Sequence, residues 1–249
     1  MEDKLTISAL QQMKRDGRKI VGVVAWDTEM ARIADRAGVD LVSVGDSVGV
    51  NLWGHATDTE VTVDEMLICC KAVRRGAKRV LVSCDVPNGP VQAGTQAAVG
   101  AAVRLAKGGG ADMVKVLGDP GMVKAVVRAG VPVFAEFHGG KEISVEKLVE
   151  EAKRLEDAGA SLLDFRHSGP VAGAAAVRAV SIPVIGGLGG GPWLDGRIRM
   201  AHAAIGYAAS NLESKTETYA NVARITLDAI TAYADDVRAG RHLKGQRPA

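Results

Sequence analysis

The sequence predicts an α/β protein that folds as a single (β/α)8 TIM barrel with an N-terminal helix. Apolar, β-branched runs alternate with amphipathic helical segments about eight times in 249 residues, and the connections between them are short. Hydrophobic residues make up 47% of the chain and aromatic residues only 4%, so Ala, Val, Leu and Ile must build the core. Polar residues follow many of the predicted strands, which favours a barrel, because a barrel gathers all its strand ends at one mouth. An open doubly wound sheet is the alternative.

The individual elements follow from their periodicity and their boundary residues. Apolar runs predict strands at 19–25, 41–44, 79–84, 111–117, 131–135, 161–165, 182–186 and a short one at 205–208. Helical spacing predicts helices at 6–16, 29–37, 62–76, 95–107, 120–128, 144–158, 171–179, 195–204 and 219–239. Asp27 or Thr28 is expected to cap the second of these helices. We expect residues 1–249 to form one domain that ends in a flexible polar tail at 240–249.

The bulk composition excludes several classes of partner. The chain has 31 basic and 29 acidic residues, and the basic ones are dispersed, so nothing favours nucleic acid. Its three cysteines form no CxxC pair, which argues against a disulfide framework or a zinc site and favours a reducing cytoplasm. No window approaches about 18 consecutive apolar residues, and the charged start does not resemble a secretory signal. We therefore expect a cytoplasmic protein without a membrane partner.

Two acidic residues lie where buried strands end. Asp46 follows the strand at 41–44, and Asp85 follows the strand at 79–84. Carboxyl ends of parallel strands converge on the rim where ligands bind, so this pair predicts a shared hard cation such as Mg²⁺. Glu136 or Asp119 is a candidate to complete the metal shell. Either aspartate of the pair alone could instead cap a helix or form a turn.

The same rim carries candidate contacts for a substrate carboxylate. Lys115 lies inside an apolar strand, which is a costly position unless its ammonium group meets an anion at the barrel mouth. The hydroxyl group of Ser47 is a further donor, and Gly45 allows the backbone to approach a ligand closely. A divalent ion at this position can hold a 2-oxo acid and stabilise the enolate formed from it.

Proton transfer is assigned to residues that follow the fifth and sixth strands. Glu136 and His138 end the fifth strand, and His167 follows the sixth. An imidazole suits general acid–base catalysis because its unperturbed pKa lies near neutrality. The alternative for each histidine is a hydrogen-bonded structural role. A glycine-rich run at 187–191 also fits a phosphate-binding loop.

Several motifs resemble the ketopantoate hydroxymethyltransferase (3-methyl-2-oxobutanoate hydroxymethyltransferase) family. They are the runs at 44–49, 54–55, 61–66, 71–77, 112–116, 182–186, 189–192, 195–196 and 233–241. The resemblance implies a (β/α)8 barrel of the phosphoenolpyruvate mutase/isocitrate lyase superfamily, Mg²⁺, methylenetetrahydrofolate as co-substrate, pantothenate biosynthesis and a large homo-oligomer such as a decamer. Position by position, Asp46 and Asp85 match metal ligands, and Ser47 and Lys115 match substrate-carboxylate contacts.

Four positions depart from the family pattern. Leu117 replaces a glutamate, and Trp26 replaces a tyrosine of the first strand. The run 136–138 differs from a pattern of histidine, leucine and glycine. The catalytic glutamate of the family falls near Arg166 or His167. The chemistry of this chain therefore needs its own assignment of the base.

Three functional hypotheses follow. The first is a metal-dependent hydroxymethyltransferase or aldolase-type enzyme that acts on a 2-oxo acid through an enolate. The second is a C–C lyase of the same superfamily that acts on another 2-oxo or hydroxy acid and needs no one-carbon donor. The third is a non-catalytic homologue that binds its ligand without turnover.

Overall fold

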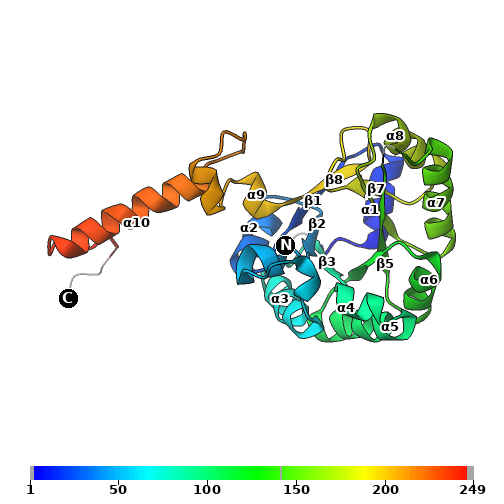
Figure 1. Ribbon diagram of the computed structural model, residues 1–249, viewed down its shortest axis with the longest axis horizontal. Helices are drawn as coiled ribbons and strands as arrows, with labels where there is room; N and C mark the ends of the chain where they lie inside the picture. Colours follow the sequence, from blue (N-terminus) through cyan, green and yellow to red (C-terminus); the bar gives the residue numbers. More distant parts are fainter. Residues whose placement is uncertain (1–2, 141, 246–249) are drawn as a thin grey trace. The chain divides into compact units, whose positions relative to one another are not determined.

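The computed structural model describes residues 3–140 and 142–245, and it confirms the predicted barrel. Eight parallel strands close in sequence order, with helices around them (Figure 1). The strands are β1 (Ile20–Val24), β2 (Leu41–Val44), β3 (Leu81–Asp85), β4 (Met113–Leu117), β5 (Val133–His138), β6 (Leu162–Arg166), β7 (Val184–Gly186) and β8 (Gly196–Met200).

Most helices begin and end close to their predicted boundaries; the exceptions are α4, which was not predicted, and the helix predicted at 195–204. The α-helices are α1 (Ile7–Arg15), α2 (Thr28–Arg36), α3 (Val63–Gly76), α4 (Asn88–Gln92), α5 (Thr95–Val103), α6 (Pro120–Arg128), α7 (Val145–Asp157), α8 (Pro170–Ala179), α9 (Ala201–Ala204) and α10 (Val222–Arg238). Short π or 3-10 turns are η1 (Gly49–Trp53), η2 (Asp58–Glu60), η3 (Arg104–Gly108) and η4 (Ala209–Leu212). Asp27 caps α2 as predicted, because its side chain accepts a hydrogen bond from the Met30 amide. No helix in the described ranges is long and apolar enough to span a membrane.

The eighth strand lies earlier in the chain than the sequence predicts. The structure places it at Gly196–Met200 rather than at 205–208, so the helix predicted at 195–204 is wrong except for its last turn, which is α9. Gly196 and Ile198 are buried, whereas the arginines between and after them are exposed. That alternation has the period of a strand, and it overrides the weak helical spacing of the segment.

Contacts between residues divide the chain after Arg199 into two compact units. The first unit holds α1 to α8, β1 to β7 and all of β8 except its last residue, and the second holds α9, η4 and α10. The expectation of one domain over 1–249 stays a prediction. Of the predicted tail, 246–249 lie outside the described residues.

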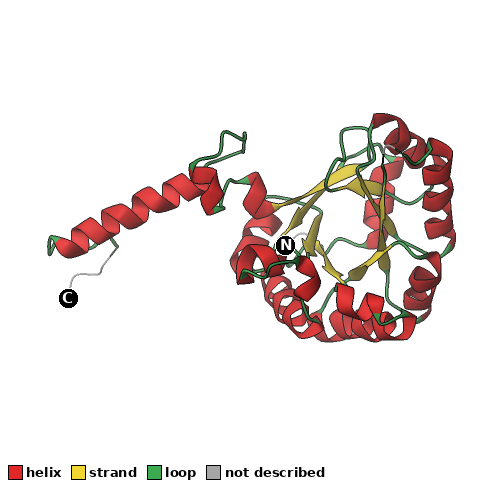
Figure 2. Ribbon diagram, viewed as in Figure 1, coloured by secondary structure: helices red, strands yellow, loops and turns green. Residues whose placement is uncertain are grey.

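The lower end of the barrel, where the strands begin, is closed by apolar side chains. Each strand contributes one residue to this layer, and α1 adds two more. The layer consists of Leu10, Met13, Ile20, Leu41, Leu81, Met113, Phe134, Leu162, Ile185 and Ile198. Figure 2 shows the strands as a ring with the helices outside it. Since this end is filled, polar residues inside the barrel are confined to the opposite end, where the strands finish.

Closure between β8 and β1 depends on a glycine without room for a side chain. A Cβ atom on Gly196 would lie 2.1 Å from the Ile20 carbonyl oxygen. We expect Gly196→Ala to lower the free energy of unfolding by about 3 kcal/mol, because the added methyl group would force the backbone of β8 or β1 to move. Gly100→Ala is the matched control, because nothing lies within 4 Å of that position in α5. Urea denaturation would measure both, and equal stabilities of the two variants would contradict this account of closure.

Candidate active site

Six charged side chains gather at the carboxyl ends of the strands. Alternation along each strand turns these residues toward the inside of the barrel. The strand register aligns Asp85 with Lys115, and Glu136 with Asp164. The six residues are Asp46, Asp85, Lys115, Glu136, Asp164 and Arg166. The structure therefore brings the predicted residues of β2 to β5 together and adds a pair from β6.

Lys115 is the hub of this cluster. Its ammonium nitrogen lies 2.9 Å from Asp85 Oδ2, 3.1 Å from Glu136 Oε2 and 3.8 Å from Asp164 Oδ2. Burial opposes the charge, yet the three carboxylates raise the pKa of Lys115 above its usual value. The side chain therefore stays protonated, and its charge links three strands.

Glu136 uses its two carboxylate oxygens differently. Its Oε2 atom meets both Lys115 and Arg166, the latter at 2.8 Å, and Oε1 lies 2.8 Å from His138 Nε2. Burial would raise the pKa of Glu136, but the two cations and the histidine hold it below its usual value. An ionised carboxylate can only accept, so Nε2 of His138 carries the proton and donates it. The other ring nitrogen, Nδ1, is then an acceptor on a side chain that is 46% exposed.

Asp164 and Arg166 are site residues that the sequence reasoning missed. Asp164 is 1% exposed, and its Oδ1 atom accepts the Gly187 amide at 3.1 Å. Arg166 donates from Nε to Asp164 Oδ2 at 3.3 Å and is 26% exposed. The sequence held a signal for Asp164. Burying an aspartate inside an apolar strand costs free energy just as burying Lys115 does, and the sequence analysis singled out only the lysine.

Asp46 and Asp85 carry negative charge that the cluster does not compensate. Four carboxylates face only two cations when all are ionised, so two negative charges remain. Burial raises the pKa of Asp85 to about 7, although Lys115 opposes that shift. Burial also raises the pKa of Asp46, whose carboxyl group forms no ion pair or hydrogen bond with any residue in the described ranges. A divalent cation would balance this excess.

The donor set fits an ion that keeps most of its water. The described residues hold no group of three or more His, Cys, Asp or Glu arranged for a metal ion. Glu136 is engaged by three partners, and Asp119 caps α6 by accepting the Gly121 amide, so neither offers a free ligand. Mg²⁺ needs only one or two carboxylates, with water and substrate completing its shell. Asp46 and Asp85 fit that requirement.

The turn that presents Asp46 is held by a buried tryptophan. Trp26 is 3% exposed, and its indole nitrogen donates to the Gly45 carbonyl at 3.0 Å. A Cβ atom on Gly45 would lie 3.0 Å from Ser47 Oγ, so a larger residue would crowd this turn. Trp26 therefore supports the backbone beside Asp46, and the predicted contacts Gly45 and Ser47 lie in that turn.

His167 has an unusual backbone conformation. Its φ of 51° lies in the left-handed region, which non-glycine residues rarely adopt. Its amide donates to the Leu188 carbonyl at 2.7 Å, and its ring centre lies 6.4 Å from that of His138. Such strain clusters at functional sites. The exposed imidazole therefore stands at the rim, next to the histidine that Glu136 holds.

The fold and the charged mouth define a (β/α)8-barrel enzyme whose site lies at the strand ends. A sequence profile of the ketopantoate hydroxymethyltransferase family matches residues 4–243. The chain therefore belongs to this family, whose members are C–C bond-forming transferases. The 3-methyl-2-oxobutanoate hydroxymethyltransferase of a Cyanothece species is 37% identical, over 94% of this chain and 96% of that protein. The enzyme of the same name from Geobacillus kaustophilus is 35% identical, over 91% and 87%.

Solved structures share the fold at low sequence identity. A phosphonopyruvate hydrolase in complex with oxalate and Mg²⁺ has a TM-score of 0.64 and 15% identity, covering 98% of this chain and 91% of that one. A 2,3-dimethylmalate lyase, described as a PEP mutase/isocitrate lyase superfamily member, has a TM-score of 0.62 and 14% identity, covering 98% and 99%. These likenesses support the barrel assignment.

The buried carboxyl group of Asp85 gives metal-free protein a definite pH dependence. Folding raises its pKa from 3.8 to about 7, so between these values the folded state keeps a proton that the unfolded chain releases. The stability that this group contributes is complete below about pH 4 and is lost as pH rises to about 7. In EDTA, the stability of Asp85→Asn relative to wild type should therefore grow over this window, on the scale of about 1.4 kcal/mol per pKa unit.

Urea denaturation of both proteins at several pH values would measure this difference. Asp157→Asn, at an exposed position at the end of α7, is the control and should track wild type at every pH. Parallel stability curves for Asp85→Asn and wild type would contradict the raised pKa.

Proposed function

We propose that this enzyme transfers a hydroxymethyl group to 3-methyl-2-oxobutanoate through an enolate, with a divalent cation such as Mg²⁺. Family membership supports the reaction, because the relatives carry the name of this substrate. The observation that carries the mechanism is the pair Glu136 and His138, joined at 2.8 Å inside a mouth with two uncompensated carboxylates. It supplies a base where a cation site and a substrate site meet.

Asp46 and Asp85 would hold the cation. When bound, the ion supplies Lewis-acid chemistry that polarises the keto group and favours loss of the proton on C3. The substrate carboxylate would lie by the turn 45–47, where the Ser47 hydroxyl group is a donor and Gly45 leaves the backbone open. Lys115, held beside Asp85, adds positive charge on the same side.

His138 is the proposed base. Because Nε2 donates to Glu136, the lone pair on Nδ1 is free to accept the C3 proton of the substrate. Glu136 stabilises the imidazolium that results, and Lys115 and Arg166 keep Glu136 ionised. His167 at the rim is a candidate to pass the proton on to solvent.

The reaction balances without an oxidant. The C3–H bond breaks, its proton moves to His138, and its electron pair becomes the enolate. C3 then bonds to a one-carbon unit at the oxidation level of formaldehyde. Methylenetetrahydrofolate supplies that carbon, its two C–N bonds to the unit break, and one water supplies the hydroxyl oxygen. The products are ketopantoate, which serves pantothenate biosynthesis, and tetrahydrofolate.

A Schiff base on Lys115 is disfavoured. A nucleophilic lysine needs a lowered pKa, and the three carboxylates around this one raise it. Metal-assisted enolate formation therefore fits the site better than imine chemistry.

A C–C lyase acting on a second substrate class remains the alternative, and one observation favours it. The guanidinium of Arg166 is 26% exposed at the mouth and could meet a second carboxylate of a dicarboxylic substrate.

Turnover tests the whole proposal. Purified protein with Mg²⁺, 3-methyl-2-oxobutanoate and methylenetetrahydrofolate should form ketopantoate, measured by mass spectrometry. EDTA or Asp85→Ala should abolish the product, whereas Asp157→Ala should not. Release of two fragments from a dicarboxylic hydroxy acid, without any need for the folate, would replace this reaction by the lyase.

Deuterium exchange isolates the first step. In D2O with Mg²⁺ and no folate, the enzyme should exchange the C3 proton of 3-methyl-2-oxobutanoate, which NMR follows directly. His138→Gln should slow this exchange by about 10²- to 10⁴-fold, the contribution expected of a general base. His242→Gln, at an exposed position of the second unit, is the control. Exchange at the wild-type rate in His138→Gln would remove this residue as the base.

The family resemblance also supports a homo-oligomer, which we retain as a proposal. The family resemblance implies a large assembly such as a decamer, so ten subunits is the number to test. Light scattering of the purified chain at several concentrations would decide it, and a mass equal to the 25.9 kDa of one chain would contradict it.

A further inference from the structure

A cavity of about 550 Å³ lies beside β5, between the barrel mouth and α7. This volume falls in the range of pockets that bind cofactor-sized molecules. Its lining includes both Glu136 and His138, so it adjoins the proposed base. None of the residues assigned above to the cation or to the substrate carboxylate lines it.

The cavity exists because two neighbouring strands end at different heights. The last pair between β4 and β5 is Leu117 with Glu136, whereas β5 continues to His138 and pairs there only with β6. The chain turns away from the barrel at Gly118, where a Cβ atom would lie 2.6 Å from the Glu136 carbonyl oxygen. Beyond Gly118, the wall between β4 and β5 therefore has a gap.

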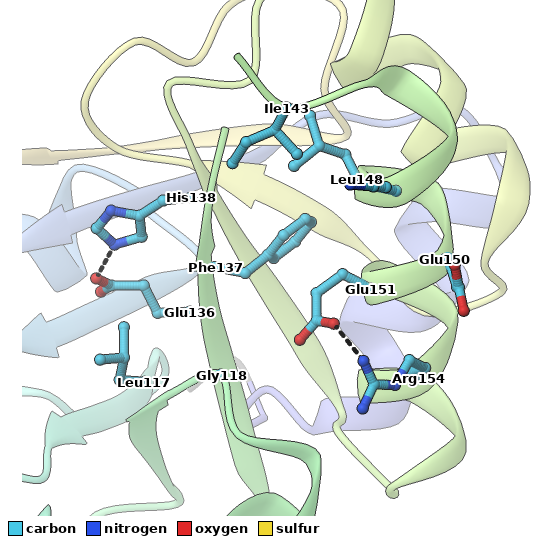
Figure 3. Close-up of a pocket in the computed structure, with 11 residues that line it drawn as sticks. Leu117, Gly118, Glu136, Phe137, His138, Ile143, Leu148, Glu150, Glu151 and Arg154 are labelled. Atoms are coloured by element: carbon cyan, nitrogen blue, oxygen red, sulfur yellow. Dashed lines mark hydrogen bonds and ion pairs between the residues drawn. The ribbon is translucent and has the colours of Figure 1, made fainter. Parts of the chain in front are cut away.

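The gap joins two different environments. Figure 3 shows Glu136 and His138 on one side of β5, and Phe137 with Leu148 of α7 on the other. A ligand in this cavity can therefore touch the catalytic pair at one end and the outer helix at the other. The barrel mouth remains free for the 2-oxo acid.

The lining suits a flat ring system with polar ends. Leu117, 54% exposed, and Ile143, 43% exposed, offer apolar surface, and the buried ring of Phe137 stacks on Phe165 with centres 4.2 Å apart. Apart from Glu136, the charged lining residues come from α7. Glu151 pairs with Arg154 at 3.2 Å, whereas Lys147 forms no ion pair with any residue that the structure describes.

We infer that this cavity binds the one-carbon carrier, a reduced pteridine with an anionic tail, and this inference rests on the proposed function. The aminopyrimidinone edge of such a ring presents adjacent donors, which match the carboxylate of Glu151. The carboxylates of the tail match the free ammonium group of Lys147. A small inorganic anion would lack partners for the apolar walls and would be repelled by the glutamates.

Two variants test the assignment. Leu117→Trp fills the cavity from the mouth side, and Lys147→Ala removes the cation. Their matched controls are Val171→Trp, at a position of α8 that is 69% exposed, and Lys153→Ala, at an exposed position of α7 outside the lining. The measurements are calorimetric binding of tetrahydrofolate to the Mg²⁺-loaded protein, and the ratio of the hydroxymethyl-transfer rate to the C3 exchange rate.

Each cavity variant should weaken tetrahydrofolate binding and lower the rate ratio by about tenfold or more, and the controls should match wild type. Unchanged binding and an unchanged ratio in both cavity variants would overturn the assignment. Wild type that exchanges the C3 proton but does not bind tetrahydrofolate would overturn it as well. Failure of the proposed function is a separate result, because wild type would then show no exchange even without the carrier. If Leu117→Trp does not fold, the tetrahydrofolate binding and the rate ratio of Lys147→Ala, a substitution on the surface of α7, decide whether the assignment holds.

Discussion

One buried ammonium group organises the active end of this barrel. Lys115 lies within 4 Å of carboxylates from β3, β5 and β6, and without its charge these three acids would repel one another in a poorly solvated space. Removing one member of such a buried network costs about 3–5 kcal/mol, because the remaining charges lose their partners. The spacing of the strand ends and the ionisation of the site are therefore set by the same side chain.

The mouth has two functional halves that this lysine separates. On the side of β2 and β3, burial raises the pKa of Asp46 and of Asp85, and the Ser43 hydroxyl group donates to Oδ1 of Asp85 at 3.4 Å. On the side of β5 and β6, Arg166 and Glu136 neutralise each other and orient His138. The proposed cation site and the proposed base thus lie at neighbouring but chemically distinct positions.

The sequence predicts the barrel because parallel strands that are covered on both faces appear as continuous apolar runs between helical segments. It fails at the eighth strand, where Arg197 and Arg199 interrupt the apolar run and only the packing of Gly196 against Ile20 shows which segment closes the ring. The acids at 46 and 85 and the lysine were predictable from their place at strand ends. The grouping of Asp164 and Arg166 with them was not, because it depends on the register between β5 and β6. The indole of Trp26, which replaces a tyrosine of the family pattern, donates to the Gly45 carbonyl, a contact that the sequence did not predict.

The apolar floor of the barrel has a consequence for the order in which ligands bind. Leu10 and Met13 of α1 close the end where the strands begin, so no ligand reaches the site from below. Both reactants must therefore enter at the end where the strands finish. On one side of that end, the two-residue overhang of β5 past β4 borders the cavity beside α7. With the carrier in that cavity, as inferred above, the two reactants occupy separate positions, and neither has to bind before the other.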